Sequence, residues 1–194
     1  MAEFLPLIGF VFFGLFSPGP NVILLTASGA RFGFRPTVPH ILGVAVGVGI
    51  TSGLTGFGVG ALLLSLPQLT FVLKVAASLW ILWMAYKLWH AGPTRDVKAA
   101  DKPFTFIEAV LFQWVNPKVW AVALSATAYV VSYPPGTQAM ALALTFSGIN
   151  LFVCLFWTYA GTLLSYLLKN IAAWTVFLRI MAVALVGFSL LVFI

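Results

Sequence analysis

The sequence predicts an all-α integral membrane protein with six transmembrane helices, arranged as two inverted three-helix repeats in which the first helix of each repeat is broken. Of the 194 residues, 62% are hydrophobic and only 7% are charged, whereas soluble domains carry about 25% charged residues. So few charges cannot cover a water-soluble core. The apolar residues also form stretches that match the roughly 20 residues of a membrane-spanning helix, and the first stretch of each half contains proline midway.

The predicted spans are separated by short polar turns at residues 31–36, 66–68 and 133–136 and by the longer hydrophilic segment 91–103. The spans are expected at residues 4–28, 37–64, 69–89, 104–131, 138–168 and 172–194. We interpret the chain as a single transmembrane domain, residues 1–194. It consists of a first repeat, residues 1–90, a cytoplasmic loop, residues 91–103, and a second repeat, residues 104–194.

The distribution of basic residues predicts the orientation. Lys and Arg occur in the turns after the first, third and fifth spans, and none occurs in the opposite turns. Loops rich in Lys and Arg stay in the cytoplasm, so both termini are expected on the non-cytoplasmic side of the inner membrane.

Several classes of function are excluded. The net charge of +6 comes from basic residues scattered at the ends of apolar stretches, so we expect the lipid bilayer as a partner and no nucleic acid. The single cysteine, Cys154, cannot form an intrachain disulfide. The sequence contains no metal-ligand cluster, phosphate loop or nucleophile–base arrangement, so we expect no metal, no cofactor and no enzymatic activity.

Two proline-containing motifs occupy corresponding positions in the two halves. Ser17-Pro18-Gly19-Pro20-Asn21 lies in the first span and Asn116-Pro117-Lys118 in the fourth, with Pro18 and Pro117 99 residues apart. Three spans per half place the halves upside down relative to each other, and inverted repeats with broken helices are typical of transporters.

A break of this kind suits ligand binding. Proline leaves carbonyl groups without an amide partner, and lipid cannot satisfy them. A half-helix that begins after the break directs free N–H groups and its positive dipole end at the membrane midplane, where they can bind a carboxylate. A plain proline kink is the alternative for one motif alone. The two motifs together favour a binding site.

Lys118 is the most informative side chain, because it lies near the middle of the fourth span, where a buried cation costs about 2.5–3.5 kcal/mol. It is expected to contact a substrate carboxylate or, alternatively, a carbonyl freed by Pro117. Asn21 and Asn116 could cap the broken helices or contact substrate. Gln113 and Asn150 could line the site or form interhelical hydrogen bonds.

The predicted substrate-binding residues all lie at or near the two breaks or on the fifth span: Pro18, Gly19, Pro20, Asn21, Gln113, Asn116, Pro117, Lys118 and Asn150. Glu108 is the only acidic residue within a predicted span and is therefore the candidate for proton coupling, although it lies only one turn inside, where an interfacial carboxylate near Lys102 is the alternative. His40 could titrate near neutrality, and we expect it to cap the cytoplasmic end of the second span.

The second span is rich in glycine, including Gly43, Gly47, Gly49 and Gly53. Such spacing predicts close helix packing, against the broken first helix or in a homo-oligomer.

The pattern resembles the LysE/RhtB-type family of amino-acid exporters. The resemblance covers essentially the whole chain and rests on its length, its six spans and the motifs Ser17-Pro18-Gly19-Pro20-Asn21 and Asn116-Pro117-Lys118. It implies a secondary transporter that exports amino acids or related small metabolites across the bacterial inner membrane, driven by the proton gradient. It also implies that the motif positions form the transport core. Many relatives have Asp where Asn21 stands, which leaves substrate and coupling open.

Two other functions are compatible with a polar midplane and few acidic groups. One is a passive channel, and the other is a non-transporting membrane assembly factor on the same scaffold.

Overall fold

The computed structural model describes residues 4–91, 102–167, 170–191 and 193, and the regular elements in these ranges are helices. The all-α prediction is therefore confirmed. In chain order the elements are α1 (Leu5–Phe16), α2 (Pro20–Phe32), α3 (Phe34–Gly56), α4 (Val59–Leu64), α5 (Pro67–Trp89), α6 (Phe106–Val115), α7 (Pro117–Ala126), the 3-10 turn η3 (Thr127–Tyr129), α8 (Pro135–Leu167) and α9 (Ile171–Leu191).

Four helices in the described ranges, α3, α5, α8 and α9, are each long and apolar enough to cross a membrane. The pair α1 and α2 meets the same criterion as one span bent by 58°. With the bent pair counted as one span, the described ranges hold five candidate spans, against six predicted. The remaining one, at residues 104–131, corresponds to two ten-residue helices, α6 and α7, of which α6 is classed only as a shorter apolar helix.

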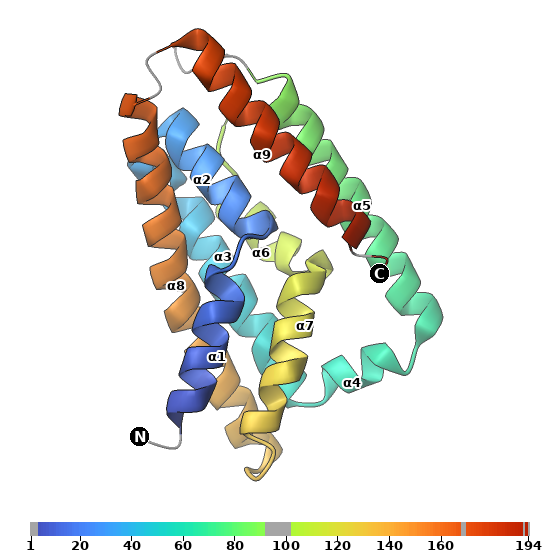
Figure 1. Ribbon diagram of the computed structural model, residues 1–194. Helices are drawn as coiled ribbons and strands as arrows, with labels where there is room; N and C mark the ends of the chain where they lie inside the picture. The colour runs from blue at the N-terminus through green and yellow to red at the C-terminus, as the bar shows by residue number, and fades with distance from the viewer. Residues whose placement is uncertain (1–3, 92–101, 168–169, 192, 194) are drawn as a thin grey trace.

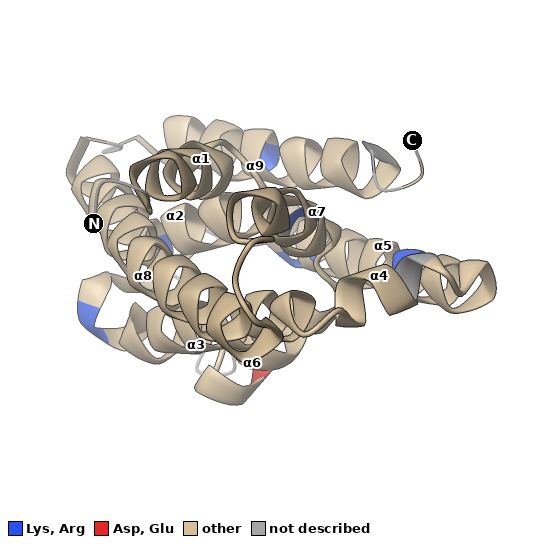
Figure 2. Ribbon diagram, turned by 90° about the horizontal axis from the view of Figure 1, so that it is seen from below, with Lys and Arg blue, Asp and Glu red and all other residues tan. Residues whose placement is uncertain are grey.

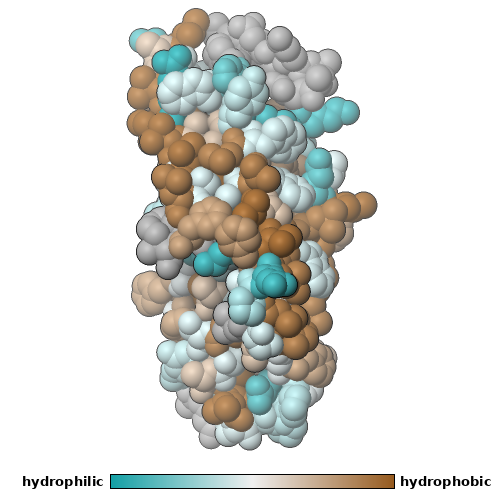
Figure 3. All heavy atoms as spheres, turned by 90° about the vertical axis from the view of Figure 1, so that its right-hand side faces the viewer, coloured by the Kyte–Doolittle hydropathy of each residue, from teal (hydrophilic) through white to brown (hydrophobic). Residues whose placement is uncertain are grey.

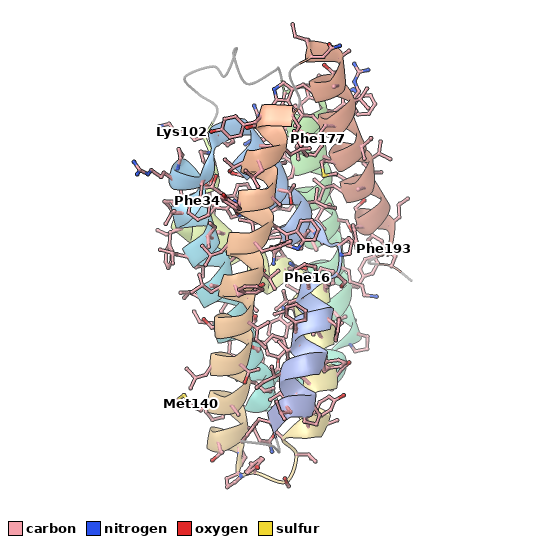
Figure 4. The ribbon with its side chains drawn as sticks, turned by 60° about the vertical axis from the view of Figure 1, so that its left-hand side comes forward. Phe16, Phe34, Lys102, Met140, Phe177 and Phe193 are labelled. Carbon is pink, nitrogen blue, oxygen red and sulfur yellow. The ribbon has the colours of Figure 1, made fainter. Side chains whose placement is uncertain are left out.

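Proline ends and restarts the helix at both predicted breaks. The helix α1 stops at Phe16, and Pro20 occupies the first turn of α2, where its missing N–H costs nothing. The helix α6 stops at Val115, and Pro117 begins α7. Figure 4 shows Phe16, the last residue of α1, about midway along the bundle between the ends near Phe34 and Met140. The first break thus lies in the middle of the molecule.

The helices α3 and α8 pack side by side, with α2 against α8 and α6 against α3, and α8 lies along the left-hand edge of the bundle in Figure 1. Glycine permits this closeness. A Cβ atom at Gly49 would meet the side chain of Ser147 at 3.0 Å, one at Gly53 would meet Ala143 at 3.1 Å, and one at Gly47 would meet Gln113 at 2.7 Å. Close packing of the glycine-rich span is confirmed, and its glycines contact α8 and α6 rather than the first helix.

The helices α5 and α9 form a second packed pair, on the right-hand side of Figure 1. Their shared core includes Ile81 and Met84 of α5 and Leu178 and Leu185 of α9, all buried. Large apolar side chains also remain exposed on the outer surfaces, for example Leu79, Leu144 and Val183. Figure 3 shows such brown side chains over the face that α5 occupies. An apolar outer surface of this extent suits contact with lipid.

Candidate functional site

The ammonium group of Lys118 bridges the two breaks. Its Nζ atom donates to the backbone carbonyl of Ser17 at 2.5 Å, to the Ser17 hydroxyl at 2.9 Å and to the carbonyl of Pro18 at 3.3 Å. These carbonyls follow the C-terminal end of α1, where the helix dipole is negative. Pairing with a carbonyl freed by Pro117, the alternative considered from the sequence, is therefore replaced by pairing with carbonyls of the other break, about a hundred residues away.

Gly19 provides the space for this contact. A Cβ atom at this position would lie 2.8 Å from Cδ and 2.9 Å from Nζ of Lys118. The backbone of Gly19 is extended, which any residue can adopt, so the glycine is needed here for room rather than for backbone freedom. Gly19 also begins α2 without a side-chain cap, and this leaves the first turn of α2 open toward the neighbouring cavity.

Asn21 and Gln113 form a reciprocal amide pair that joins α2 to α6. Asn21 Nδ2 donates to Gln113 Oε1 at 2.9 Å, and Gln113 Nε2 donates back to Asn21 Oδ1 at 3.2 Å. Gln113 Nε2 also donates to the carbonyl of Ala109 at 2.9 Å. The pair uses both polar ends of each amide, so it fixes the first turn of α2 against the last turn of α6.

Asn116 connects this pair to Lys118. Its Oδ1 accepts from the backbone N–H of Lys118 at 3.2 Å and so caps α7, while its Nδ2 lies 3.4 Å from Gln113 Oε1. Asn116 is therefore a helix cap, one of the two roles left open for it by the sequence. The capped α7 contrasts with the uncapped α2.

The helix α8 closes the site with one face. Asn150, Val153, Cys154 and Trp157 occur at helical spacing and line a cavity of about 20 Å³ together with Gly19, Pro20, Asn21, Asn116 and Lys118. A cavity of this size holds about one water molecule. Neither Asn150 Nδ2 nor Trp157 Nε1 has a hydrogen-bond partner within the described part of the chain, although both atoms are buried. Two unpaired donors thus belong to residues that line the same small space as Lys118.

The structure brings most of the predicted residues together. Pro18 and Pro117 form the breaks themselves, and the cavity lining includes six others: Gly19, Pro20, Asn21, Asn116, Lys118 and Asn150. Gln113 reaches the site through its bond to Asn21.

Glu108 lies apart from the breaks. It forms a capping box at the start of α6, where its carboxylate accepts from the backbone N–H and the hydroxyl of Thr105 at 2.8 and 2.9 Å. Its partner is therefore Thr105 rather than the Lys102 side chain. Among the described residues it is the only acidic one, and Figure 2 shows it in red at the beginning of α6.

Sequence reasoning missed two residues of the site, Ser17 and Trp157. Ser17 is part of the first motif, and the Lys118 contact to its hydroxyl depends on how the halves pack. Trp157 follows Asn150 by seven residues, two turns along α8, and this spacing is the signal that could have found it.

A protein-family model matches most of the chain. The model for the LysE type translocator matches residues 12–194. The chain belongs to this family. This LysE type translocator is similar to the cysteine/O-acetylserine efflux protein of Escherichia coli strain K12, with 28% identity over 158 residues that cover 79% of the chain and 80% of the relative. A protein of the same description from Shigella flexneri serotype 5b matches equally well, and no solved structure matches significantly.

Family membership and the apolar helices identify a multi-pass transport protein of the inner membrane. The relatives are efflux proteins, and the translocator is not an enzyme. In the ranges that the structure describes, no group of three or more His, Cys, Asp or Glu side chains could hold a metal ion.

Proposed function

We propose that this LysE type translocator exports small amino acids with uncharged side chains, or closely related metabolites, by binding the substrate carboxylate between the two helix breaks. The observation that carries this proposal is the position of the Lys118 ammonium, which contacts only neutral oxygen atoms in the described part of the chain. A carboxylate carries a full negative charge, so it attracts an ammonium group more strongly than a neutral carbonyl oxygen does. A substrate carboxylate can therefore displace the carbonyls of Ser17 and Pro18.

The rest of the cavity lining supports this binding mode. The uncapped first turn of α2 offers backbone N–H groups and the positive end of a helix dipole. Asn150 and Trp157 offer side-chain donors that lack partners among the described residues. These groups suit the oxygen atoms of a carboxylate or of an ester such as that of O-acetylserine.

The substrate class follows from the charges around the cavity. None of the described lining residues is acidic, so a cationic side chain would meet the Lys118 ammonium without a compensating carboxylate. The relatives are named for efflux of cysteine and O-acetylserine, which both have small uncharged side chains. We therefore expect neutral substrates and poor transport of lysine or arginine.

The central cavity supports a carrier over an open pore. A space of about 20 Å³ is too small for an amino acid, so α1–α2 and α6–α7 have to move for a substrate to enter. We propose that these two pairs are the broken first helices of inverted repeats, residues 1–90 and 104–194. In this arrangement α6–α7 is the fourth of six spans, and both termini lie outside the cytoplasm.

Export against a gradient also needs an energy source, for which we propose the proton gradient. Glu108 is the candidate coupling residue, as the only acidic side chain in the described ranges, and the capping box of α6 would then open when it is protonated.

Counterflow in proteoliposomes tests the central site. Vesicles loaded with O-acetyl-L-serine and diluted into the labelled compound are expected to show saturable exchange with the wild-type protein. Lys118→Met removes the charge and should abolish exchange, whereas Lys118→Arg keeps the charge and should retain part of it. Trp157→Phe keeps the ring and removes the donor, and it should weaken apparent affinity. Unaltered exchange in Lys118→Met would refute the site, and flux that never saturates would support a channel.

A further inference from the structure

A second cavity, much larger than the central one, opens between α2, α3, α5 and α6. Its volume is about 670 Å³, within the range of small-molecule binding sites. Its walls include Leu24 and Ser28 of α2, His40 of α3, Met84 of α5 and Glu108 of α6. We call this cavity the vestibule. It shares no lining residue with the central cavity in the described part of the chain.

The vestibule contains the buried imidazole of His40, whose nitrogen atoms lack hydrogen-bond partners in the described ranges. His40 is only 2% exposed, and neither of its ring nitrogens has a hydrogen-bond partner in the described ranges. Its ring contacts that of Phe104, at 5.1 Å between centroids. His40 therefore does not cap the second span as expected from the sequence. A neutral imidazole carries one donor and one acceptor, and burying both without partners is unfavourable unless a ligand or water supplies them.

The charged groups of the vestibule suit a zwitterion. Arg31, Lys87 and Lys102 belong to its lining, and all three are cations. Glu108 provides the one carboxylate of the described lining. Figure 4 shows Lys102 near the same end of the bundle as Phe34, the first residue of α3; α2 also ends here, at Phe32. An amino acid would find cations for its carboxylate and an anion for its ammonium group within one space.

The vestibule and the central cavity are adjacent along two helices. Asn21 lines the central cavity, and Leu24, less than one turn further along α2, lines the vestibule. On α6, Glu108 lines the vestibule, and Gln113 is bonded to Asn21. The amide pair of Asn21 and Gln113 therefore joins α2 and α6 where one space gives way to the other.

We propose that the vestibule is a second amino-acid binding site, in which His40 hydrogen-bonds the substrate carboxylate before the substrate passes the amide pair into the central cavity. The proposal rests on the proposed function for its ligand class. It assigns a binding role to His40 and Ser28, which the central site does not use. Ser28 has a hydroxyl 3.1 Å from that of Thr37, so it can turn one hydrogen bond toward a ligand while keeping this contact.

Equilibrium binding of labelled O-acetyl-L-serine to the full-length protein in lipid nanodiscs tests the second site. The wild-type protein is expected to bind two molecules per chain. Lys118→Met disables the central site and should leave one, and His40→Phe should also leave one. Combining the two substitutions should leave none. His40→Gln restores a donor and an acceptor and should recover binding to within about fivefold of the wild-type affinity, because one neutral hydrogen bond changes affinity by about that factor.

One control and one milder variant protect the interpretation against unfolding. Leu185→Met changes a buried apolar residue of α9 that does not line the vestibule, at nearly constant volume, and is expected to keep two sites. Ser28→Ala is a milder second test, expected to weaken the site that survives in Lys118→Met.

The outcomes separate the two proposals. Loss of all binding in Lys118→Met alone, or two sites in His40→Phe, would overturn the vestibule site and leave the central site standing. Absence of binding to the wild-type protein would overturn the proposed substrate class and the vestibule site together.

Discussion

The amide pair of Asn21 and Gln113 allows a quantitative test of how the two halves are held together. Asn21→Leu and Gln113→Met replace the amides with apolar side chains of similar size, singly and together. Side-chain hydrogen bonds between membrane helices contribute about 0.6 kcal/mol on average. The two bonds of 2.9 and 3.2 Å therefore predict a coupling free energy of about 1.2 kcal/mol, or about eightfold in the unfolding equilibrium constant.

Reversible unfolding in dodecyl sulfate, followed by tryptophan fluorescence, measures this coupling through a double-mutant cycle. Gln113→Met is expected to destabilise more than Asn21→Leu, because it also removes the bond to the Ala109 carbonyl. Thr175→Val in α9, whose hydroxyl bonds only within its own helix, is the control partner and should add to Gln113→Met without coupling. A coupling energy for the amide pair within the scatter of about 0.3–0.5 kcal/mol seen for independent sites would refute the reasoning.

Three further predictions concern packing, capping and the central site. Gly29→Val is expected to lower the free energy of unfolding strongly, because the valine side chain would collide with the backbone of α8. Gly9 has open space around it, so Gly9→Val should change the free energy of unfolding little. Equal effects of the two substitutions would contradict this account. Thr105→Val removes the capping box of α6 and should cost about 1 kcal/mol, measured by the same unfolding assay, and an unchanged midpoint would count against it. Gly19→Ala should displace the Lys118 ammonium from the carbonyls of Ser17 and Pro18 and lower the exchange of substrate without unfolding the protein. Counterflow measures the exchange, and a melting curve checks the folding. Exchange at the wild-type rate would show that this contact is dispensable.

The two breaks could be predicted because their cause is local. Proline removes a backbone donor wherever it stands in a helix, so Pro18, Pro20 and Pro117 mark the ends of α1 and α6 without knowledge of the fold. The apolar stretches likewise predict α5, α8 and α9 to within a few residues, and α8 begins at Pro135 as the preceding turn suggests. The span expected at residues 37–64 is instead divided at residues 57–58 into α3 and α4.

The partners of the polar side chains could not be predicted in the same way. Lys118 binds carbonyls of Ser17 and Pro18, and only the packing of one half against the other brings these atoms together. Trp157 lies in an apolar run, which is typical of a lipid-facing residue. The rotation of α8 about its axis instead places Trp157 in the lining of the central cavity. The glycines of α3 predict that another helix packs closely against it, but not which one, because any helix with small side chains fits such a surface.

We expect the break in α6–α7 to affect how the chain enters the bilayer during synthesis. Each of its two helices has ten residues, too few to cross a bilayer, and Lys118 stands at the junction, so we expect this segment to insert poorly by itself. Its N-terminal half packs on Gly43 and Gly47 of α3, which is synthesised earlier, while α8 follows later. Because α3 precedes α6–α7 in the chain, we expect α3 to be in the membrane already when α6–α7 is synthesised and to provide a surface for it. A copy of residues 106–126 placed in an unrelated membrane protein should therefore fail to insert.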